Sequence, residues 1–397
     1  MNSSILLSSA AKYSDDRVNG LKVSRDCFVT TDSMIQNKGG ITITPVLPKG
    51  NLIAYSKGDI LIGNIRPYLK KIWYANKNGG CSPDVLVIQA KSNIDSKFLY
   101  YSLFRDDFFS HMMNGSKGTK MPRGDKGQIL RFQIPNIELS TQQKIASVLS
   151  ALDSKIELNN RINAELEAMA KTLYDYWFVQ FDFPDKNGKP FKSSGGKMVW
   201  NEELKREIPE GWVSSELKDI ANITMGQSPP GESYNEEGDG MIFYQGCTDF
   251  GNRFPTVRKF TTEPTRFAKK GDILLSVRAP VGTMNIAKEN CCIGRGLASL
   301  NSKDNCIGYL FGVMVNLKQI FDRRNVDGTT FGSITKDDLF SLKVVMPTIN
   351  ILEKYHIVIN SSFEKQNQLE LENIKITELR DWLLPMLMNG QVTVSEL

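Results

Sequence analysis

The 397-residue sequence is poor in the residue types that build metal and disulfide sites. It has six cysteines without a Cys-x-x-Cys pair, and its only histidines are His111 and His356. A tetrahedral zinc site needs such ligands at characteristic spacings, which are missing here. We therefore expect no metal site in this chain, and we predict free, mostly buried thiols.

The sequence also lacks long apolar runs. No stretch approaches the roughly 18 uninterrupted apolar residues that a membrane span needs, and the opening MNSSILLSSAAKYSDDRVNG lacks the basic region of a secretory signal peptide. We therefore expect a cytoplasmic protein with no membrane contact. A hydrophobic fraction of 41% and a charged fraction of 23% are typical of globular proteins, and the length predicts two or more folded units.

Motifs of enzymes that act on DNA are missing as well. There is no G-x-x-x-x-G-K-[ST] phosphate loop, no glycine-rich methyl-donor loop after a strand and no Asn-Pro-Pro-Tyr type motif. Pro83-Asp84 followed by Gln89-Ala90-Lys91 resembles a metal-dependent nuclease motif, but an amide replaces the second carboxylate that metal binding needs. A buried strand explains this segment more simply. His111 and His356 have no matched Ser or Cys partner, so we assign no catalytic residue.

Positive charge is concentrated in the first part of the chain. Residues 1–140 contain 19 Lys and Arg against 11 Asp and Glu, whereas residues 141–180 contain 4 against 5. This distribution allows one surface to face a polyanion while another packs on protein. A net charge of +5 alone is weak support for nucleic-acid binding.

The chain carries an internal duplication. The tetrapeptide GDIL occurs at 58–61 and again at 271–274, an offset of 213. Asn114-Gly115 and Asp327-Gly328 have the same offset, and Pro135 and Pro347 lie 212 apart, each between a β-like and a helical segment. The predicted plan is therefore globular, helical, globular, helical, with twisted sheets in the globular parts.

Both helical segments have a heptad-like apolar pattern. With Thr141 as a possible N-cap, the first pattern runs through Ile145, Leu149, Leu152, Ile156, Asn159, Asn163, Leu166, Ala170, Leu173 and Trp177. The second runs through Leu369, Glu372, Ile376, Leu379 and Leu383, and we expect Pro385 to end it. Core packing would explain such stripes, but a helix of about 36 residues, roughly 54 Å, is too long for one globular unit to bury. Antiparallel pairing of the two helices as a coiled-coil spacer is favoured.

Three long segments resemble one protein family. Residues 143–174, residues 174–212 (YDYWFVQFDFPDKNGKPFKSSGGKMVWNEELKREIPEGW) and residues 379–392 (LRDWLLPMLMNGQV) are similar to the conserved regions of Type I restriction–modification DNA-specificity subunits. The resemblance implies an α+β fold in which two pseudo-repeated α/β target-recognition domains are separated by two long helices, in a pseudo-twofold arrangement. The implied parts are target-recognition domain 1 (1–140), conserved helix 1 (141–180), a linker (181–210), target-recognition domain 2 (211–347) and conserved helix 2 (348–397).

The same resemblance implies a division of labour. This non-catalytic subunit would read double-stranded DNA, two methyltransferase subunits would grip its helices and methylate adenine N6, and translocating nuclease subunits would complete the restriction complex. S-adenosylmethionine, ATP and Mg²⁺ are then expected on these partners, with no cofactor in this chain. The helix residues expected at the partner-binding segments are Ile145, Leu149, Leu152, Ile156, Leu166, Leu173, Leu369, Ile376, Leu379 and Leu383.

DNA recognition requires cations for phosphates and polar groups for base edges. The loop at 114–126, the segment after each GDIL and the polar segments before GDIL supply both kinds of group. The predicted DNA-binding residues are Lys117, Lys120, Arg123, Arg66, Lys70, Lys71, Thr31, Gln245, Thr248, Arg278, Thr329, Thr330, Ser333 and Lys336. A charged loop is often only solvated. Arg66 could instead pair with Asp32 or Asp84, and Arg278 with Asp249 or Asp272.

Two unlike domains related by a pseudo-twofold axis predict an asymmetric bipartite target, with half-sites about one helical turn apart, roughly 34 Å. Three alternatives remain: a scaffold whose globular parts bind protein, a nuclease that depends on Asp84, and a restriction system with fused or fewer partners.

Overall fold

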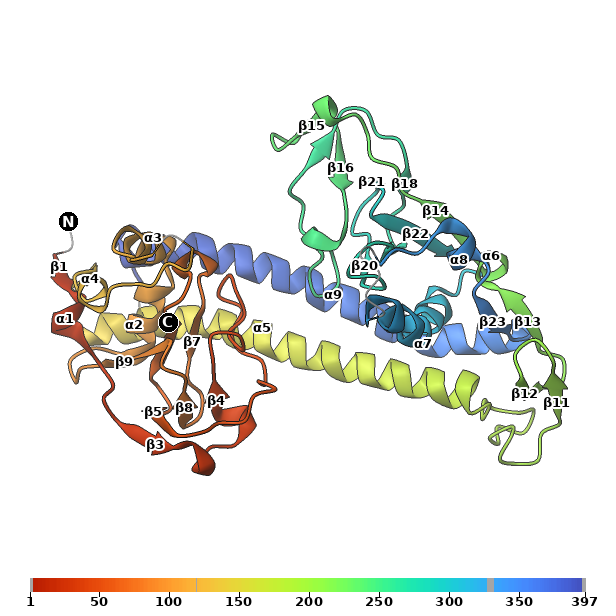
Figure 1. Cartoon of the computed structure of the whole chain (residues 1–397), viewed down its shortest axis with the longest axis horizontal. Coiled ribbons are helices and arrows are strands. Elements are labelled where there is room, and N and C mark those ends of the chain that lie inside the picture. Colours follow the sequence, from red (N-terminus) through yellow and green to blue (C-terminus); the bar gives the residue numbers. More distant parts are fainter. Residues whose placement is uncertain (1–2, 119, 327–331, 395–397) are drawn as a thin grey trace. The chain divides into compact units, whose positions relative to one another are not determined.

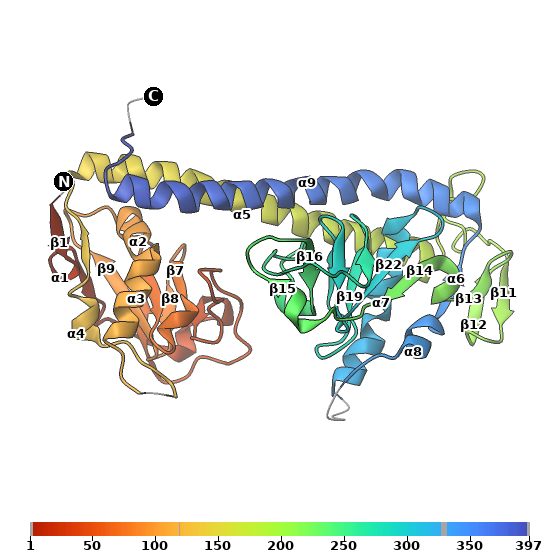
Figure 2. The ribbon, with the colours of Figure 1, turned by 90° about the horizontal axis from the view of Figure 1, so that it is seen from above.

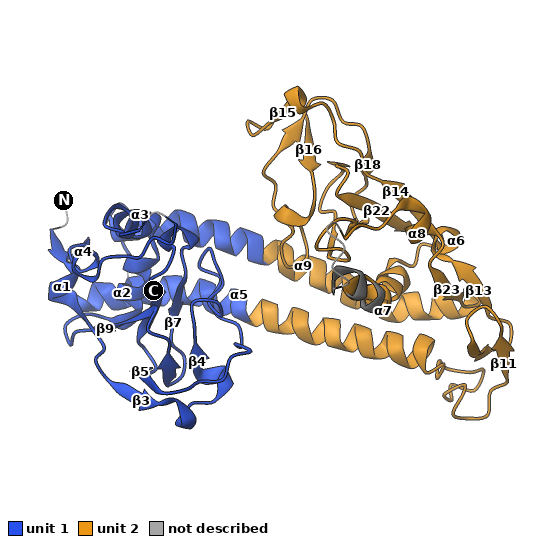
Figure 3. Cartoon of the chain, in the orientation of Figure 1, with its two compact units in different colours: residues 1–157, 373–397 blue, residues 158–372 orange. Residues whose placement is uncertain are grey.

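The chain consists of two compact units. The computed structural model describes residues 3–118, 120–326 and 332–394. Unit 1 comprises residues 1–157 and 373–397, and unit 2 comprises residues 158–372 (Figure 3). Two long helices, α5 (Leu139–Tyr174) and α9 (Ile349–Met388), each begin in one unit and end in the other.

Unit 1 is built around two four-stranded sheets (Figure 1). The first is antiparallel with the order β2-β9-β6-β7, and the second has the order β3-β5-β8-β4, in which β4 runs parallel to β8. A separate pair, β1-β10, joins the start of the unit to the strand before α5. The elements are β1 (Ser4–Leu6), α1 (Leu7–Ala10), β2 (Ala11–Tyr13), β3 (Arg17–Asn19), β4 (Phe28–Val29), β5 (Asn51–Tyr55), β6 (Ile60–Gly63), β7 (Ile72–Tyr74), β8 (Gly79–Cys81), β9 (Val85–Ala90), α2 (Ser96–Phe104), α3 (Asp106–Asn114), α4 (Lys126–Ile129) and β10 (Gln133–Pro135).

Unit 2 repeats this plan with additions. Its first sheet has the order β14-β22-β19-β20, its second has the order β15-β17-β16-β21-β18, and β13 pairs with β23. A further hairpin, β11-β12, precedes the repeat. The elements are β11 (Met198–Asn201), β12 (Arg206–Pro209), β13 (Val213–Glu216), α6 (Leu217–Ile220), β14 (Ala221–Met225), β15 (Tyr234–Asn235), β16 (Met241–Tyr244), β17 (Phe260–Thr261), β18 (Phe267–Ala268), β19 (Ile273–Ser276), β20 (Met284–Ile286), β21 (Cys291–Ile293), β22 (Leu297–Ser302), α7 (Ile307–Val326), α8 (Lys336–Phe340) and β23 (Lys343–Met346).

The GDIL repeat marks equivalent strands. Ile60 of β6 pairs with Ile88 of β9, and Ile273 of β19 pairs with Leu300 of β22. The preceding glycines have φ angles of 97° and 89°, a left-handed conformation that glycine adopts without strain. Pro135 ends β10 before α5, as Pro347 follows β23 before α9. The predicted duplication is confirmed at these anchors; Asp327-Gly328 lies outside the described residues.

In unit 1 both long helices contribute to the domain core. Aromatic residues of α2 and α3 pack with apolar residues of the first sheet, and Ile145 and Leu149 of α5 join the same buried cluster. Leu384 and Leu387 of α9 complete it. The helical pair and the globular part of unit 1 therefore share one hydrophobic core.

The two helices are antiparallel in both units. In unit 1 Asp153 Oδ1 lies 2.8 Å from Arg380 Nη1, next to the cluster that joins the start of α5 to the end of α9. In unit 2 Asn159 donates to Glu372 over 2.9 Å, and in the helical turn Asp175–Val179 that follows α5 the ring of Trp177 lies 5.4 Å from that of Tyr355. Figure 2 shows α5 and α9 side by side within each unit. The predicted antiparallel pairing is confirmed.

Two predictions of where the long helices begin and end were wrong. Helix α5 begins at Leu139, before the expected cap Thr141. Helix α9 continues through Pro385 to Met388, because Leu384 and Met388 are anchored in the core of unit 1 and the Asn389 N–H donates to the Pro385 carbonyl. A proline inside a helix removes one backbone hydrogen bond and crowds the preceding turn, and the buried contacts of the last turn offset this cost here.

The residue register of α9 also differs from the apolar pattern. Leu369 is buried, but Leu379 is 44% exposed, while the polar residues Gln366, Glu370 and Asn373 are buried. Helix α9 contacts globular parts as well as α5, so its inward face is wider than one heptad seam and includes polar residues.

The segment before the β11-β12 hairpin forms an aromatic cluster. The ring of Phe178 lies 4.7 Å from that of Tyr309 and 4.8 Å from that of Tyr355. Phe183 stacks on Trp212 with ring centroids 4.9 Å apart. The residues of the YDYWFVQFDFP segment therefore hold the end of α5 onto unit 2.

The cysteines are as predicted. All six are free, and Cys81, Cys291, Cys292 and Cys306 are buried. Among the described residues, no group of three or more His, Cys, Asp or Glu side chains could hold a metal ion. No helix in the described part of the chain is long and apolar enough to cross a membrane.

Candidate nucleic-acid interface

In unit 1 the segment after β6 meets the basic loop at 114–126. The Asn64 N–H donates to the carbonyl of Asp84, the first residue before β9, over 2.9 Å. The Gly124 N–H donates to the Asn64 carbonyl over 3.1 Å, and the Arg66 N–H donates to the Pro122 carbonyl over 2.8 Å. The structure therefore brings together segments that the sequence analysis selected separately.

Four predicted cations lie on this surface. Arg66 and Lys120 are exposed, and neither forms an ion pair with another residue of the described ranges. Lys117 pairs with Asp125 over 3.2 Å, and its side chain stays 83% exposed. Arg123 pairs with Asp84 over 3.0 Å and stays 59% exposed. Ion pairs this exposed are weak, so these side chains can exchange their carboxylate for a phosphate.

Structural contacts within unit 1 engage three further predicted residues, Lys70, Lys71 and Thr31. Lys70 and Lys38 both pair with Asp106, over 3.0 and 2.7 Å. Partial burial disfavours the charged form of Asp106, but hydrogen bonds from the two ammonium groups outweigh it and hold the pKa of this carboxyl below its usual value. Lys71 Nζ donates to the Thr31 carbonyl over 2.5 Å.

A short 3₁₀ turn, Pro67–Leu69, is set between two residues with left-handed backbones. Arg66 has φ 53° and Lys70 has φ 50°. Pro67 is buried, whereas Tyr68 is 51% exposed beside Arg66. Non-glycine residues adopt this conformation at a cost, and such strain often occurs at binding sites.

In unit 2 the equivalent segments also meet. Arg278, after β19, forms a bridge with Ser333, and the Ile334 N–H donates to the Val277 carbonyl over 2.9 Å. Arg278 and Ser333 are both exposed. In unit 1 the corresponding bridge joins Ile65 to Arg123.

The matched bridges show that Arg66 and Arg278 do not occupy equivalent positions of the repeat. Arg278 is equivalent to Ile65 and not to Arg66. Three of the four carboxylates proposed as their partners are engaged elsewhere: Asp84 by Arg123, Asp249 by Arg258 over 2.9 Å, and Asp272 by neutral side chains within its sheet.

A polar cluster of unit 2 contains Arg295, which was not predicted from the sequence. Gln245 follows β16, is exposed, and donates to Ser228 Oγ over 2.9 Å. The backbone N–H of exposed Arg295 lies 3.4 Å from the same oxygen. Arg295 is flanked by buried Gly294 and Gly296, whose Cα atoms approach the backbone of Gln245 so closely that a Cβ would lie 2.9 and 2.7 Å from it.

The remaining predicted DNA-binding residues are less defined. Thr248 is exposed in the 3₁₀ turn Cys247–Asp249, which follows Gln245. Lys336 begins α8, is exposed, and lies over the Phe340 ring at 5.2 Å. Thr329 and Thr330 lie outside the described residues.

The helix residues predicted for partner binding differ in how much of each side chain is exposed. Ile145, Leu149 and Leu369 are buried within their own units. The half-buried ones are Leu152, Ile156, Leu166, Leu173, Ile376 and Leu383. Leu379 and its neighbour Trp382, which is 55% exposed, offer apolar surface on α9.

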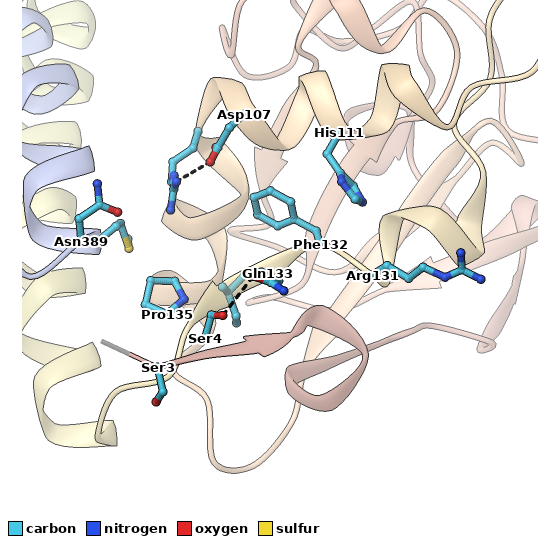
Figure 4. A pocket seen from close by; sticks show the side chains of 12 residues that line it. Ser3, Ser4, Asp107, His111, Arg131, Phe132, Gln133, Pro135 and Asn389 are labelled. Atoms are coloured by element: carbon cyan, nitrogen blue, oxygen red, sulfur yellow. Dashed lines mark hydrogen bonds and ion pairs between the residues drawn. The ribbon is translucent and has the colours of Figure 1, made fainter. Parts of the chain in front are cut away.

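A separate cavity of about 670 Å³ lies in unit 1 (Figure 4). None of the predicted DNA-binding residues lines it. Its polar groups largely serve one another: Arg105 pairs with Asp107, and Ser4 donates to Gln133 over 3.1 Å. His111 bonds to the Gln128 carbonyl over 2.7 Å, so a structural role accounts for this histidine.

The nuclease-like segment is built into the sheet. Val85 to Ile88 are buried in β9, as the simpler interpretation predicted. Gln89 donates to Asp59 over 3.2 Å, and Lys91 donates to the Ser8 carbonyl over 2.8 Å. Structural contacts therefore account for both polar residues.

Comparisons with known proteins agree with the duplicated architecture. A profile of the Type I restriction modification DNA specificity domain matches residues 14–168 and 209–379. Over 274 residues the chain is 34% identical to the putative type I restriction enzyme MjaX specificity subunit of Methanocaldococcus jannaschii, covering 67% of this chain and 61% of that protein, so the match spans less than two thirds of the relative's length. It is 24% identical over 439 residues to the type I restriction enzyme HindI specificity subunit of Haemophilus influenzae, covering 92% and 94% of the two chains.

A solved structure shares the fold. The Type-I restriction-modification system S subunit from M. genitalium matches with a TM-score of 0.58 at 19% identity, covering 97% of this chain and 96% of that one. The family profile matches each globular part once, and the two parts have similar sheets. The chain belongs to the Type I restriction–modification DNA-specificity family.

Proposed function

We propose that this chain is the DNA-reading subunit of a Type I restriction–modification complex, and that each unit reads one part of an asymmetric, bipartite double-stranded target. The observation that carries the proposal is the repeated surface. In both units the segment after the central strand of the first sheet meets the segment before α4 or α8, and each surface presents exposed cations beside polar groups. Phosphate contacts position a protein on DNA, and polar groups distinguish base edges.

The partners follow from the family. We infer that two methyltransferase subunits bind the helical segments and methylate adenine N6, and that translocating nuclease subunits complete the restriction complex. S-adenosylmethionine, ATP and Mg²⁺ belong to these partners in the proposal, and this chain supplies the target choice. The complex would act on DNA in the cytoplasm.

Adenine-methylation mapping tests the proposal. Genomic DNA from cells that express this chain with its cognate methyltransferase subunit is compared with DNA from cells that express the methyltransferase alone. We expect one two-part motif with a fixed gap that is methylated only in the presence of this chain. If the two proteins associate but no chain-dependent motif is found, the DNA-reading proposal fails and a scaffold role replaces it.

Lys120 gives a test of phosphate contact. Because it is exposed and forms no ion pair with a described residue, Lys120→Gln should weaken DNA binding of the assembled complex equally for all sequences. The slope of log K against log salt should become shallower by about one, the value for one lost phosphate contact. Titrations at several salt concentrations measure this slope. The exposed Lys12, outside the predicted surface, provides the control variant Lys12→Gln, whose slope should equal that of the wild type. An unchanged slope for Lys120→Gln would remove this residue from the interface.

A further inference from the structure

Arg253 is a buried cation that joins the globular part of unit 2 to α9. Only 6% of it is exposed. Its Nε donates to Asn367 Oδ1 and its Nη1 to Gln366 Oε1, each over 2.5 Å, and its Nη2 donates to the Phe363 carbonyl over 3.4 Å. The guanidinium also lies 4.3 Å from the centre of the Phe363 ring. Three donors of one guanidinium thus reach three residues within about one turn of α9.

Burial of this charge is costly. Desolvation lowers the pKa of Arg253 to about 10, although the carboxylates of Glu167 and Glu370 oppose the shift. The three hydrogen-bond acceptors are neutral amide or peptide oxygens, so the contact depends on the geometry of a planar, rigid fork more than on charge pairing. An apolar residue could fill the same space, which suggests that the arginine serves to fix a geometry.

Residues 245–253, called the reading loop below, connect the candidate DNA-reading residue Gln245 to Arg253. The reading loop leaves β16 at Gln245 and passes Thr248 before it reaches Arg253. The Arg253 carbonyl accepts from the Ile286 N–H of β20 over 2.8 Å, and Gly251 exchanges hydrogen bonds with the side chain of Asn285 over 3.1 and 3.0 Å. The loop is therefore fastened to the first sheet on one side and to α9 on the other.

We propose that Arg253 is a positioning residue, which fixes the reading loop of unit 2 on the spacer helix α9 so that the second half of the target is read in one register. The inference rests on the proposed function. Arg253 itself does not touch DNA in this scheme. Its role is to hold Gln245 and the neighbouring loop at a set orientation relative to the helix that links the two units.

Methylation mapping with Arg253→Met, in the complex with the cognate methyltransferase, tests the inference. The substitution keeps the apolar stem and removes all five guanidinium donors. Because small misplacements cost much activity, we expect methylation of the wild-type motif to fall roughly tenfold. Motifs with a gap one base pair longer or shorter, or with a degenerate second half, should gain methylation, while the first half stays unchanged. A purely structural role would instead lower methylation of the same motif without altering its gap or second half.

Variants on the helix side keep the test valid if Arg253→Met folds poorly. Asn367→Ala and Gln366→Ala remove acceptors without changing the recognition loop, and their combination should reproduce the altered gap distribution. Arg253→Lys, which retains one charged donor group, should restore the wild-type motif in part. Lys186→Met, which changes an exposed residue of unit 2 outside both long helices and the predicted DNA-binding surface, is the control and should leave the motif unchanged.

The outcomes separate the two proposals. If wild-type protein yields no chain-dependent motif, the proposed function fails. If the wild type yields one motif and the Arg253 and Asn367/Gln366 variants yield the same gap and the same second half, the proposed function stands and the positioning role is overturned.

Discussion

Replacing Arg295 with alanine is expected to weaken binding of the assembled complex to its target by roughly ten- to a hundredfold, and to relax base preference at one position in the second half-site only. The side chain is exposed, and its backbone shares Ser228 Oγ with the side chain of Gln245. An arginine beside a glutamine is a suitable pair for base edges, because arginine makes bidentate contacts with guanine and glutamine with adenine.

The glycines around Arg295 explain how it reaches this place. A Cβ on Gly296 would lie 2.7 Å from the Gln245 carbonyl oxygen, and one on Gly294 would lie 2.9 Å from the Gln245 Cα. Neither distance can be tolerated without a shift of backbone. The Gly-Arg-Gly sequence therefore allows the turn after β21 to press against the start of the reading loop, leaving only the arginine side chain outside.

Binding to a set of duplexes that differ by one base pair each would measure the effect of Arg295→Ala, at one fixed salt concentration. The matched control is Arg161→Ala, which removes an exposed arginine from α5 in the same unit. A loss of affinity that is equal for every duplex, with a shallower salt dependence, would contradict base recognition and assign Arg295 to a phosphate contact.

Of Ser228, Gln245 and Arg295, only Gln245 was predicted from the sequence. Gln245 was found because it precedes GDIL in a polar segment. Arg295 was missed because Ser228, Gln245 and Arg295 are far apart in sequence. The parallel pairing of β16 with β21 brings Gln245 next to Arg295, and the hydrogen bond from the Gln227 N–H to the Ile293 carbonyl places Ser228 beside them. Parallel neighbours leave no local signal, whereas the antiparallel β19-β20 hairpin follows directly from the chain order.

The repeat predicted strands better than side-chain roles. An offset of 213 makes Ile65, and not Arg66, the residue of unit 1 equivalent to Arg278 of unit 2. The two arginines therefore occupy positions one residue apart in the repeat, and their side chains differ in place on the two surfaces. Similarly, an apolar heptad pattern located α9 but not its inward face, because buried Gln366, Glu370 and Asn373 carry contacts that hydrophobicity cannot show. Apolar periodicity records burial against one neighbour, and α9 has several.

The repeated GDIL motif is expected to contribute to stability and not to DNA reading. Asp272, the acid of the second GDIL, is 5% exposed, and its carboxylate accepts hydrogen bonds from the Lys269 N–H over 2.8 Å and from the Ser299 and Asn301 side chains over 2.7 Å each. Asp272→Ala leaves these donors without their acceptor. We expect unit 2 to lose about 3 kcal/mol of unfolding free energy. The Asp59 carboxylate accepts two hydrogen bonds, so Asp59→Ala should lower the unfolding free energy of unit 1 by about 2 kcal/mol.

Hydrogen exchange of backbone amides distinguishes the two units in one experiment. In Asp272→Ala the amides of β19 and β22 should lose protection while those of β6 and β9 keep it, and Asp59→Ala should show the reverse. The exposed Asp239 provides the control variant Asp239→Ala. At a temperature where both variants are folded, each should retain the wild-type methylation motif, because neither carboxylate reaches the predicted surface. A changed motif with normal protection would mean that GDIL itself contacts DNA. The repeat would then mark a recognition element shared by both units instead of the buried turn that starts each central strand.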